Sequence, residues 1–392
     1  MNHGSSPSGA VMNAADFLKE CAANQAAFAL WREAGDRGIS ALRCTVPDCL
    51  DSALPENLDA DGFLLSPFAI KGDSPGATHP AVWLASDGAI ITLNPPSGSD
   101  PGKGEPVVAL GSLAAHSAGP PPRLLDETAY RKLVARGVAA IRAGGVGKVV
   151  ASRAERRSLG GNYDVLALFS RLCAAHQHAL VALVGVPDVG LWLVATPETL
   201  LKINGAQVRT MALAGTQPLA ADADPADALW SAKFIEEQAL VSRYIRAIFQ
   251  EAGFTDIEEY GPETVRAANL AHLCSRFEAL APEGNVAGMT RNLLQRMHPT
   301  SAVCGMPREA AFDFLAREEN YDRSYYSGFL GPVSAAAGQA PSRAAFYVNL
   351  RSARLIGDDI YLYVGAGVTA HSDPSAEWEE TVQKTKTLGD HL

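Results

Sequence analysis

One segment joins two glycines to a helix rich in carboxylates: Gly365-Ala366-Gly367-Val368 and, three residues later, Ser372-Asp373-Pro374-Ser375-Ala376-Glu377-Trp378-Glu379-Glu380-Thr381-Val382-Gln383-Lys384. Residues 359–364 before it, DIYLYV, are rich in aromatic and β-branched residues and predict a strand. The glycines predict a turn after that strand, with backbone N–H groups free to meet a ligand. Asp373 before Pro374 predicts a helix N-cap followed by proline at the first helical position.

The helix that follows places its charged residues on one face. Glu377, Glu380 and Lys384 are three and four residues apart, and residues at that spacing are neighbours on a helix. Two adjacent carboxylates repel each other, and a hard cation such as Mg²⁺ would relieve the repulsion while binding substrate oxygens. The alternative is an ordinary solvated ion pair between Glu380 and Lys384. Spacing alone leaves both interpretations open.

The same glycines also fit a dinucleotide-binding fingerprint, because residues 365–370 read G-x-G-x-x-A after a predicted strand. That fingerprint requires a second strand and an acidic residue roughly 20 residues further on. Only residues 388–392 stand at that distance in the sequence. We therefore expect no dinucleotide here, while an acidic ligand held through a metal ion and a solvated ion pair both stay open.

The composition is that of a globular protein. The chain has 392 residues, of which 47% are hydrophobic and 19% charged. A net charge of -10 argues against a nucleic-acid partner, which requires a basic face. The six cysteines form no C-x-x-C pair, no leader sequence is evident, and no apolar run approaches the roughly 18 residues of a membrane span. We expect a cytoplasmic protein without a membrane partner.

Glycine, proline and the hydrophobic pattern predict the organisation of the chain. We expect residues 1–12 to be disordered, 14–34 to be helical, and 13–125 to be a strand-rich part that ends in a Gly/Pro/Ser-rich loop at 95–123. In 126–392, helices alternate with strands and with a hairpin over 199–213 that turns at Asn204-Gly205. Hairpins mixed with helices favour an α+β fold, most simply one compact domain.

Four further segments carry unusual combinations of polar residues: GKVVASR (147–153), ATPETL (195–200), LAGT (213–216) and HPTSAVCG (298–305). Together with the opening segment, and in the same order, they resemble the chorismate-utilising enzymes, a family that includes isochorismate, salicylate and anthranilate synthases. The resemblance implies a single large chorismate-binding domain of antiparallel-rich sheets flanked by helices. It also implies that the substrate is the small molecule chorismate.

The resemblance assigns an acid and a base. Conversion of chorismate to isochorismate needs water to attack ring carbon C2 while the hydroxyl at C4 leaves. Lys148 matches the family lysine that activates the water, and Glu198 matches the glutamate that protonates the departing hydroxyl. Lys148 must therefore be able to lose its proton near neutral pH and Glu198 must keep one, and burial favours both. Without the resemblance both residues would be taken for surface side chains.

The resemblance also implies a Mg²⁺ site. Residues 231–238, SAKFIEEQ, resemble the family pattern S-x-K-D-x-x-E-H and place Glu237 at a metal-ligand position opposite Glu380, with Glu377 bound directly or through water. Two residues depart from the pattern. Phe234 replaces an acid, which could weaken Mg²⁺ binding, and Gln238 replaces a histidine, which predicts the loss of a hydrogen bond that packs the helix.

The remaining matches are substrate contacts. Arg351 matches the arginine that clamps the enolpyruvyl carboxylate, and a planar guanidinium suits that task better than an ammonium. Tyr326 is its expected partner, and a role in core packing is equally open for His272. The substrate-binding positions implied by the family are Ala214, Gly215, Thr216, His272, Ala302, Tyr326, Arg351, Gly365 and Lys384.

Two positions select the nucleophile. Related enzymes that form a covalent adduct carry lysine where this chain has Ala214, and those that use ammonia carry glutamine where it has Lys148. We therefore expect water as the nucleophile, no glutamine amidotransferase subunit, a monomer and isochorismate as the product, for siderophore or menaquinone synthesis. Ala302 favours an isochorismate synthase, whereas Tyr326 favours a salicylate synthase, which would go on to eliminate pyruvate. A protein that binds chorismate without turnover is the non-enzymatic alternative, because of Phe234 and Gln238.

Overall fold

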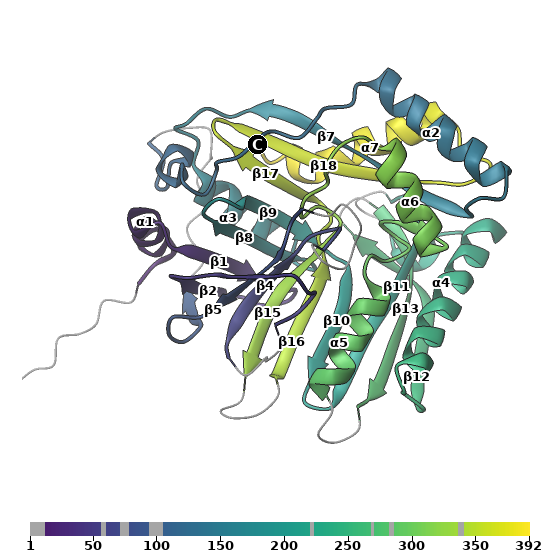
Figure 1. Ribbon diagram of the computed structural model, residues 1–392, viewed down its shortest axis with the longest axis horizontal. Helices are drawn as coiled ribbons and strands as arrows, with labels where there is room; N and C mark the ends of the chain where they lie inside the picture. Colours follow the sequence, from purple (N-terminus) through teal and green to yellow (C-terminus); the bar gives the residue numbers. More distant parts are fainter. Residues whose placement is uncertain are drawn as a thin grey trace, which may run out of the picture.

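Antiparallel strand pairing dominates the molecule, which is described here from a computed structural model. The structure describes residues 12–55, 60–70, 78–93, 105–219, 223–267, 270–281, 286–335 and 341–392. Within these ranges the named strands form two nine-stranded sheets, and every pair of neighbouring strands is antiparallel (Figure 1). The predicted α+β fold of antiparallel-rich sheets with flanking helices is confirmed.

The first sheet has the strand order β14-β7-β18-β17-β9-β8-β1-β2-β6. Its longest pair, β7 and β18, lies near one edge and stays in register from Val149↔Val368 to Ser158↔Asp359. The strands are β1 (Ala27–Arg32), β2 (Ile39–Cys44), β6 (Ile91–Leu93), β7 (Lys148–Ser158), β8 (Leu180–Val186), β9 (Gly190–Thr196), β14 (Gly305–Met306), β17 (Ser352–Ile356) and β18 (Asp359–Val368).

The second sheet has the order β12-β13-β11-β10-β16-β15-β4-β5-β3. The predicted hairpin is β10 and β11, which turns at Gly205-Ala206, one residue later than expected. The strands are β3 (Asp48–Leu50), β4 (Gly62–Ser66), β5 (Ala81–Ala85), β10 (Thr199–Asn204), β11 (Gln207–Pro218), β12 (Ile257–Ala267), β13 (Leu270–Leu280), β15 (Phe329–Ala335) and β16 (Pro341–Val348).

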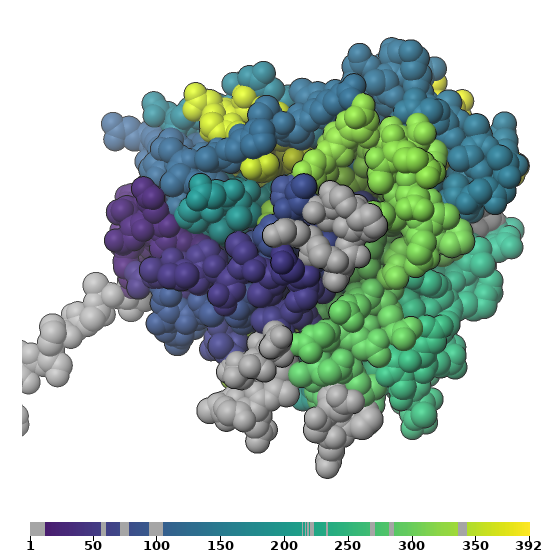
Figure 2. Space-filling view, in the orientation of Figure 1, coloured from purple at the N-terminus to yellow at the C-terminus, as the bar shows by residue number. Residues whose placement is uncertain are grey.

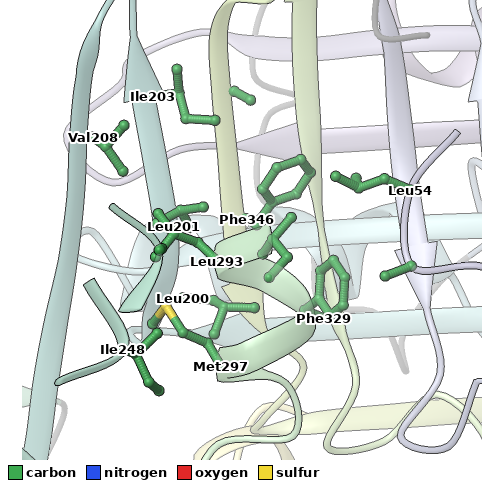
Figure 3. Close-up of a cluster of buried hydrophobic side chains, with 14 of the residues drawn as sticks. Leu54, Leu200, Leu201, Ile203, Val208, Ile248, Leu293, Met297, Phe329 and Phe346 are labelled. Carbon is green, nitrogen blue, oxygen red and sulfur yellow. The ribbon is translucent and has the colours of Figure 1, made fainter. Parts of the chain in front are cut away.

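Helices cover the outer faces of both sheets, and α4 and α5 lie along the second sheet (Figure 1). A buried cluster joins Leu201 and Phe346 of that sheet to Ile248, Leu293 and Met297 of these two helices (Figure 3). The helices are α1 (Ala14–Asn24), α2 (Glu127–Arg142), α3 (Val165–Ala175), α4 (Ala232–Glu251), α5 (Val286–Met297), α6 (Arg308–Glu318) and α7 (Pro374–Gly389), with short 3-10 turns η1 (Leu110–Leu113) and η2 (Pro225–Asp227). Across the described residues no helix is both long and apolar enough to cross a bilayer.

Residues before 125 supply strands to both sheets. β1, β2 and β6 complete the first sheet, and β3, β4 and β5 complete the second, where β4 pairs with β15. In the space-filling view the purple N-terminal segments and the green α5 and α6 region form one continuous body (Figure 2). The helix predicted over 14–34 is wrong in its second half, because α1 ends at Asn24 and β1 begins at Ala27. All six side chains of β1 are buried, and a short apolar run of this kind does not distinguish a buried strand from a helix.

Two of the predictions concern segments that are only partly described. The predicted disorder of residues 1–12 lies outside the described residues except for Met12. Residues 95–104 of the predicted loop at 95–123 also lie outside them, and the described remainder contains the turn η1.

The glycine turn predicted at 365–368 is wrong, because these residues continue β18 to Val368 in pairing with β7. Successive side chains of a strand point to opposite faces, and Tyr361 and Tyr363 fill the space between the two sheets. Gly365 and Gly367 continue the same face and carry no side chain. Gly367 therefore leaves a hollow between the sheets, whereas the Ala151 carbonyl and the Tyr326 hydroxyl occupy the space beside Gly365.

Candidate active site

That hollow belongs to a cavity of about 250 Å³. Residues of β7, β11, β13 and β18 line it together with α4, α7 and the loops that follow β9 and β16. Ten of the predicted site residues border the cavity: Lys148, Glu198, Gly215, Glu237, His272, Ala302, Arg351, Glu377, Glu380 and Lys384. Segments distant in sequence thus meet at one site.

The other four predicted residues lie around it. The ring of Tyr326 stacks on Tyr363, with ring centroids 5.3 Å apart, and its hydroxyl lies 3.2 Å from the position that a Cβ on Gly365 would take. The Gly365 carbonyl accepts a hydrogen bond from Lys384 Nζ at 2.8 Å, and a substrate contact from its backbone N–H stays a prediction. Ala214 and Thr216 flank Gly215 on β11, and their side chains are outside the described structure.

Each of the two lysines in the cavity is paired with a glutamate. Lys148 Nζ lies 3.0 Å from Glu237 Oε1, and Lys384 Nζ lies 2.6 Å from Glu380 Oε1. The i,i+4 pair expected on α7 and the shared cavity face therefore both exist. As placed, no group of three or more His, Cys, Asp or Glu side chains in the described ranges is arranged to hold a metal ion.

Glu198 is the most deeply buried carboxyl group in this cavity, with 9% of its surface exposed. It lies in the short connection between β9 and β10, where its backbone carbonyl accepts a hydrogen bond from Val348 N. Burial raises the pKa of Glu198 to about 7, against the opposing influence of Arg351, Lys148 and Lys384. Near neutral pH a substantial fraction of this carboxyl group is protonated, so it can donate a proton.

Arg351 has an unusual backbone. Its φ of 48° is in the left-handed region, which costs a non-glycine residue on the order of 1–3 kcal/mol. The turn is held by a hydrogen bond from Ala195 N to the Arg351 carbonyl at 3.0 Å. Burial lowers the pKa of Arg351, which still stays a cation at neutral pH. Among the described residues its guanidinium has no hydrogen-bond or ion-pair partner, so it can bind an anion.

His272 and Gly215 are coupled across β11 and β13. Gly215 lies at a bulge in β11 with φ 63°, a conformation that glycine adopts readily. Its carbonyl lies 3.1 Å from His272 Nδ1, which must therefore carry the proton. Burial and the nearby Arg351 lower the pKa of His272 to about 4, so it is neutral and its Nε2 is a hydrogen-bond acceptor.

The two departures on α4 have different consequences. Phe234 borders the cavity and meets Trp230 edge to face at 5.7 Å, which makes this wall apolar where the family carries an acid. Gln238 is buried and donates hydrogen bonds to the Ala212 carbonyl (3.2 Å) and to Ser275 Oγ (3.0 Å). The predicted loss of a packing hydrogen bond at Gln238 is wrong, since its amide ties α4 to the sheet.

Sequence reasoning missed several residues that line the cavity: Pro197, Leu213, Leu350, Gly367, Thr369 and Ser372. Gly367 could have been found, because strand alternation puts it on the face of Gly365. A Cβ at Gly367 would lie 3.3 Å from Lys148 Cε. The others have no distinctive chemistry, and only the fold brings them to the site.

A buried ion pair supports the strand that carries Lys148. Arg323 and Glu319 lie 2.6 Å apart, and their side chains are 2% and 3% exposed. Glu319 also accepts hydrogen bonds from the backbone N and Oγ of Ser152, while Arg323 donates to the carbonyls of Val150 and Val303. The pair thus joins β7 to the loop that carries Ala302.

Arg323→Met is expected to lower the free energy of unfolding by about 3–5 kcal/mol, because it leaves the Glu319 carboxylate buried without its partner. Denaturant unfolding followed by circular dichroism measures this change. Arg317→Met is the matched control, since Arg317 is exposed on the adjoining helix α6. Equal stability of the two variants would contradict a structural role for the ion pair.

An anion-binding arginine, a protonatable carboxyl group and paired lysines around one cavity suit an enzyme that acts on a small acidic molecule. The family model "Chorismate binding enzyme" matches residues 114–392, and the chain belongs to that family. Three curated relatives illustrate the likeness. The "Salicylate biosynthesis isochorismate synthase" of Pseudomonas aeruginosa is 33% identical over 267 residues, which cover 66% of this chain and 53% of the relative.

The vibriobactin-specific isochorismate synthase of Vibrio cholerae is 28% identical, and the match covers 62% of this chain and 61% of the relative. The isochorismate synthase MenF of Escherichia coli is 29% identical, and the match covers 67% of this chain and 60% of the relative. The match thus spans between about half and two thirds of these relatives. In fold, the chain is similar to the solved structure of Escherichia coli MenF, with a TM-score of 0.74 at 21% identity over 98% of this chain and 92% of that one. The structure titled putative DhbC from Bacillus anthracis has the same TM-score and identity, over 96% and 99%.

Proposed function

We propose that this protein is an isochorismate synthase that converts chorismate to isochorismate. The observation that carries the proposal is the meeting of Lys148, Glu198 and Arg351 at one cavity with three further carboxylates. The names of the curated relatives support the same reaction.

In the proposed reaction Arg351 binds the enolpyruvyl carboxylate through its free guanidinium. The Lys148 amine accepts a proton from a water molecule whose oxygen bonds to C2. The C4–O bond breaks, and Glu198 gives its proton to the departing hydroxyl, which leaves as water. The ring double bonds shift between these two carbons. Lys148 ends as an ammonium and Glu198 as a carboxylate, so the charges balance.

The proposal includes Mg²⁺ held by Glu237, Glu380 and Glu377. Their carboxylate oxygens are donors of the kind that Mg²⁺ binds, and all three border the cavity. When bound, the ion would offset the charge of the ring carboxylate of chorismate. Because Glu237 and Glu380 face lysines here, each must turn away from its lysine to reach a shared ion.

The ion pair with Glu237 affects the proposed role of Lys148 as the base. While Glu237 pairs with it at 3.0 Å, Lys148 acts as a charged donor, and an ammonium cannot accept a proton. Lys148 can act as the base only after it gives up this proton. We propose that the protein acts in the cytoplasm as a monomer, without a glutamine amidotransferase, and supplies siderophore or menaquinone synthesis.

Salicylate synthase remains the second candidate, because Tyr326 is buried beside Gly365 and differs from the phenylalanine of some isochorismate synthases. Chromatography of the products formed from chorismate, with Mg²⁺ and with a chelator, distinguishes the possibilities. Isochorismate formed only with Mg²⁺ is the expected result. Salicylate and pyruvate formed in equal amounts would show that the protein is a salicylate synthase. Binding of chorismate without any product would refute the proposal that the protein is an enzyme.

Gly367→Val is expected to weaken chorismate binding by about tenfold or more, since the added side chain meets Lys148 and fills part of the cavity. Titration calorimetry with chorismate at a temperature that suppresses turnover measures the affinity. Gly88→Val is the control, because a Cβ there meets nothing within 4 Å. Unchanged affinity in Gly367→Val would place the substrate elsewhere.

A further inference from the structure

We propose that a second cleft, which reaches Arg351 from outside the catalytic cavity, binds small aromatic carboxylic acids. We call it the Arg351 cleft. It has a volume of about 180 Å³ and lies among the end of α3, the residues that follow it, α7 and the end of β9. Its lining includes His176, Ala179, Ala195, Arg266, Arg351 and Thr387.

The size of the cleft sets the size of its ligand. A buried cavity of about 150 Å³ is large enough for benzene, whereas sites for drug-sized molecules start at about 300 Å³. A cleft of about 180 Å³ therefore suits one aromatic ring with a carboxylate. Gln177 and His178 are exposed at its edge, so a ligand can enter from solvent.

The charges in the cleft select an anion. None of the ten described residues that line it is acidic, and two of them are arginines. Arg351 has no hydrogen-bond or ion-pair partner among the described residues, and a guanidinium fork matches a carboxylate. Burial lowers the pKa of His176, whose Nε2 donates to the Thr387 carbonyl at 3.1 Å, so this histidine is neutral. The positive charge of the cleft therefore comes chiefly from the arginines.

Arg351 and Pro197 border both the cleft and the catalytic cavity. Arg351 is thus shared by the two spaces. A carboxylate in the cleft would bind the same group that the proposed function assigns to the substrate. We therefore expect an acid bound in the cleft to weaken chorismate binding, a consequence that rests on the proposed function, whereas the binding of the acid itself does not.

Benzoate is a suitable probe, and titration calorimetry with the full chain in the absence of chorismate measures its binding. Thr387→Phe and Ala175→Trp each fill the cleft and are expected to weaken benzoate binding by about tenfold or more. Ala175 is exposed, so its variant should fold even if Thr387→Phe does not. Gly367→Val changes only the catalytic cavity and should bind benzoate like the wild type.

No benzoate binding by the wild type, or full binding by both cleft variants, would overturn the proposal. Loss of binding in Gly367→Val with retention in the cleft variants would also overturn it, because benzoate would then occupy the catalytic cavity. Product analysis with chorismate is a separate measurement. A protein that binds benzoate in the cleft but forms no isochorismate would refute the proposed function and leave this inference standing.

Discussion

Lys148→Ala is expected to lower kcat for isochorismate formation by about 10²- to 10⁴-fold, the usual contribution of a general base. The attacking water would lose the amine that accepts its proton. The substrate contacts of Arg351 remain, so the KM for chorismate should change much less than kcat. Initial rates measured by chromatography over a range of chorismate concentrations separate the two parameters.

Lys132→Ala is the control for this variant, because Lys132 is exposed on α2 and does not line the cavity. It should match the wild type in both parameters. Circular dichroism tests whether Lys148→Ala keeps the fold, which we expect because Lys148 is the first residue of β7. Full activity of a folded Lys148→Ala protein would refute the assignment of the base.

Glu198→Gln is expected to lower kcat by a similar factor, because an amide cannot protonate the departing hydroxyl. The pH dependence of kcat tests the role of Glu198 as the acid in a second way. With a pKa of about 7, Glu198 is protonated at low pH and ionised at high pH, so wild-type kcat should fall as the pH rises through about 7. The residual rate of the variant should lack this fall. Glu236→Gln, an exposed change on α4, is the control.

The same substitution has a measurable effect on stability. The pKa of Glu198 is raised from 4.5 to about 7 in the folded protein, so folding opposes its ionisation. Its contribution to stability is complete below pH 4.5 and is lost as the pH rises through about 7. Glu198→Gln should therefore gain stability relative to the wild type between pH 5 and pH 8 in denaturant unfolding. A constant difference would mean that Glu198 is not buried as an acid.

Short sequence motifs correctly predicted the features that depend on neighbouring residues in the chain. The N-cap Asp373 accepts hydrogen bonds from Ser375 N and Ala376 N, as the Asp-Pro pair indicated. The hairpin of β10 and β11 also formed, with its turn one residue later than the predicted Asn204-Gly205. The glycines at 365 and 367 were misjudged because pairing with β7, more than 200 residues earlier, decides their conformation. No local pattern contains that information.

The candidate site likewise combines features that the sequence predicted with features that depend on tertiary packing. The resemblance grouped residues of which ten line one cavity in the structure. It did not predict that Lys148 pairs with Glu237, a contact between residues 89 positions apart. That contact depends on how α4 packs against the sheets. The hydrogen bonds of Gln238 depend on the same packing and were likewise invisible in the sequence.

The position of β18 bears on how the protein is made. β18 lies between β7 and β17 in the first sheet, yet it follows both in the chain. During synthesis β7 leaves the ribosome with an open edge long before its partner β18, whereas β17 ends only two residues before β18 begins. Unpaired edges invite pairing with other chains, and long-range pairing is slow to form. The nascent protein should therefore be most vulnerable to aggregation just before β18 emerges, and chaperones would act in that interval.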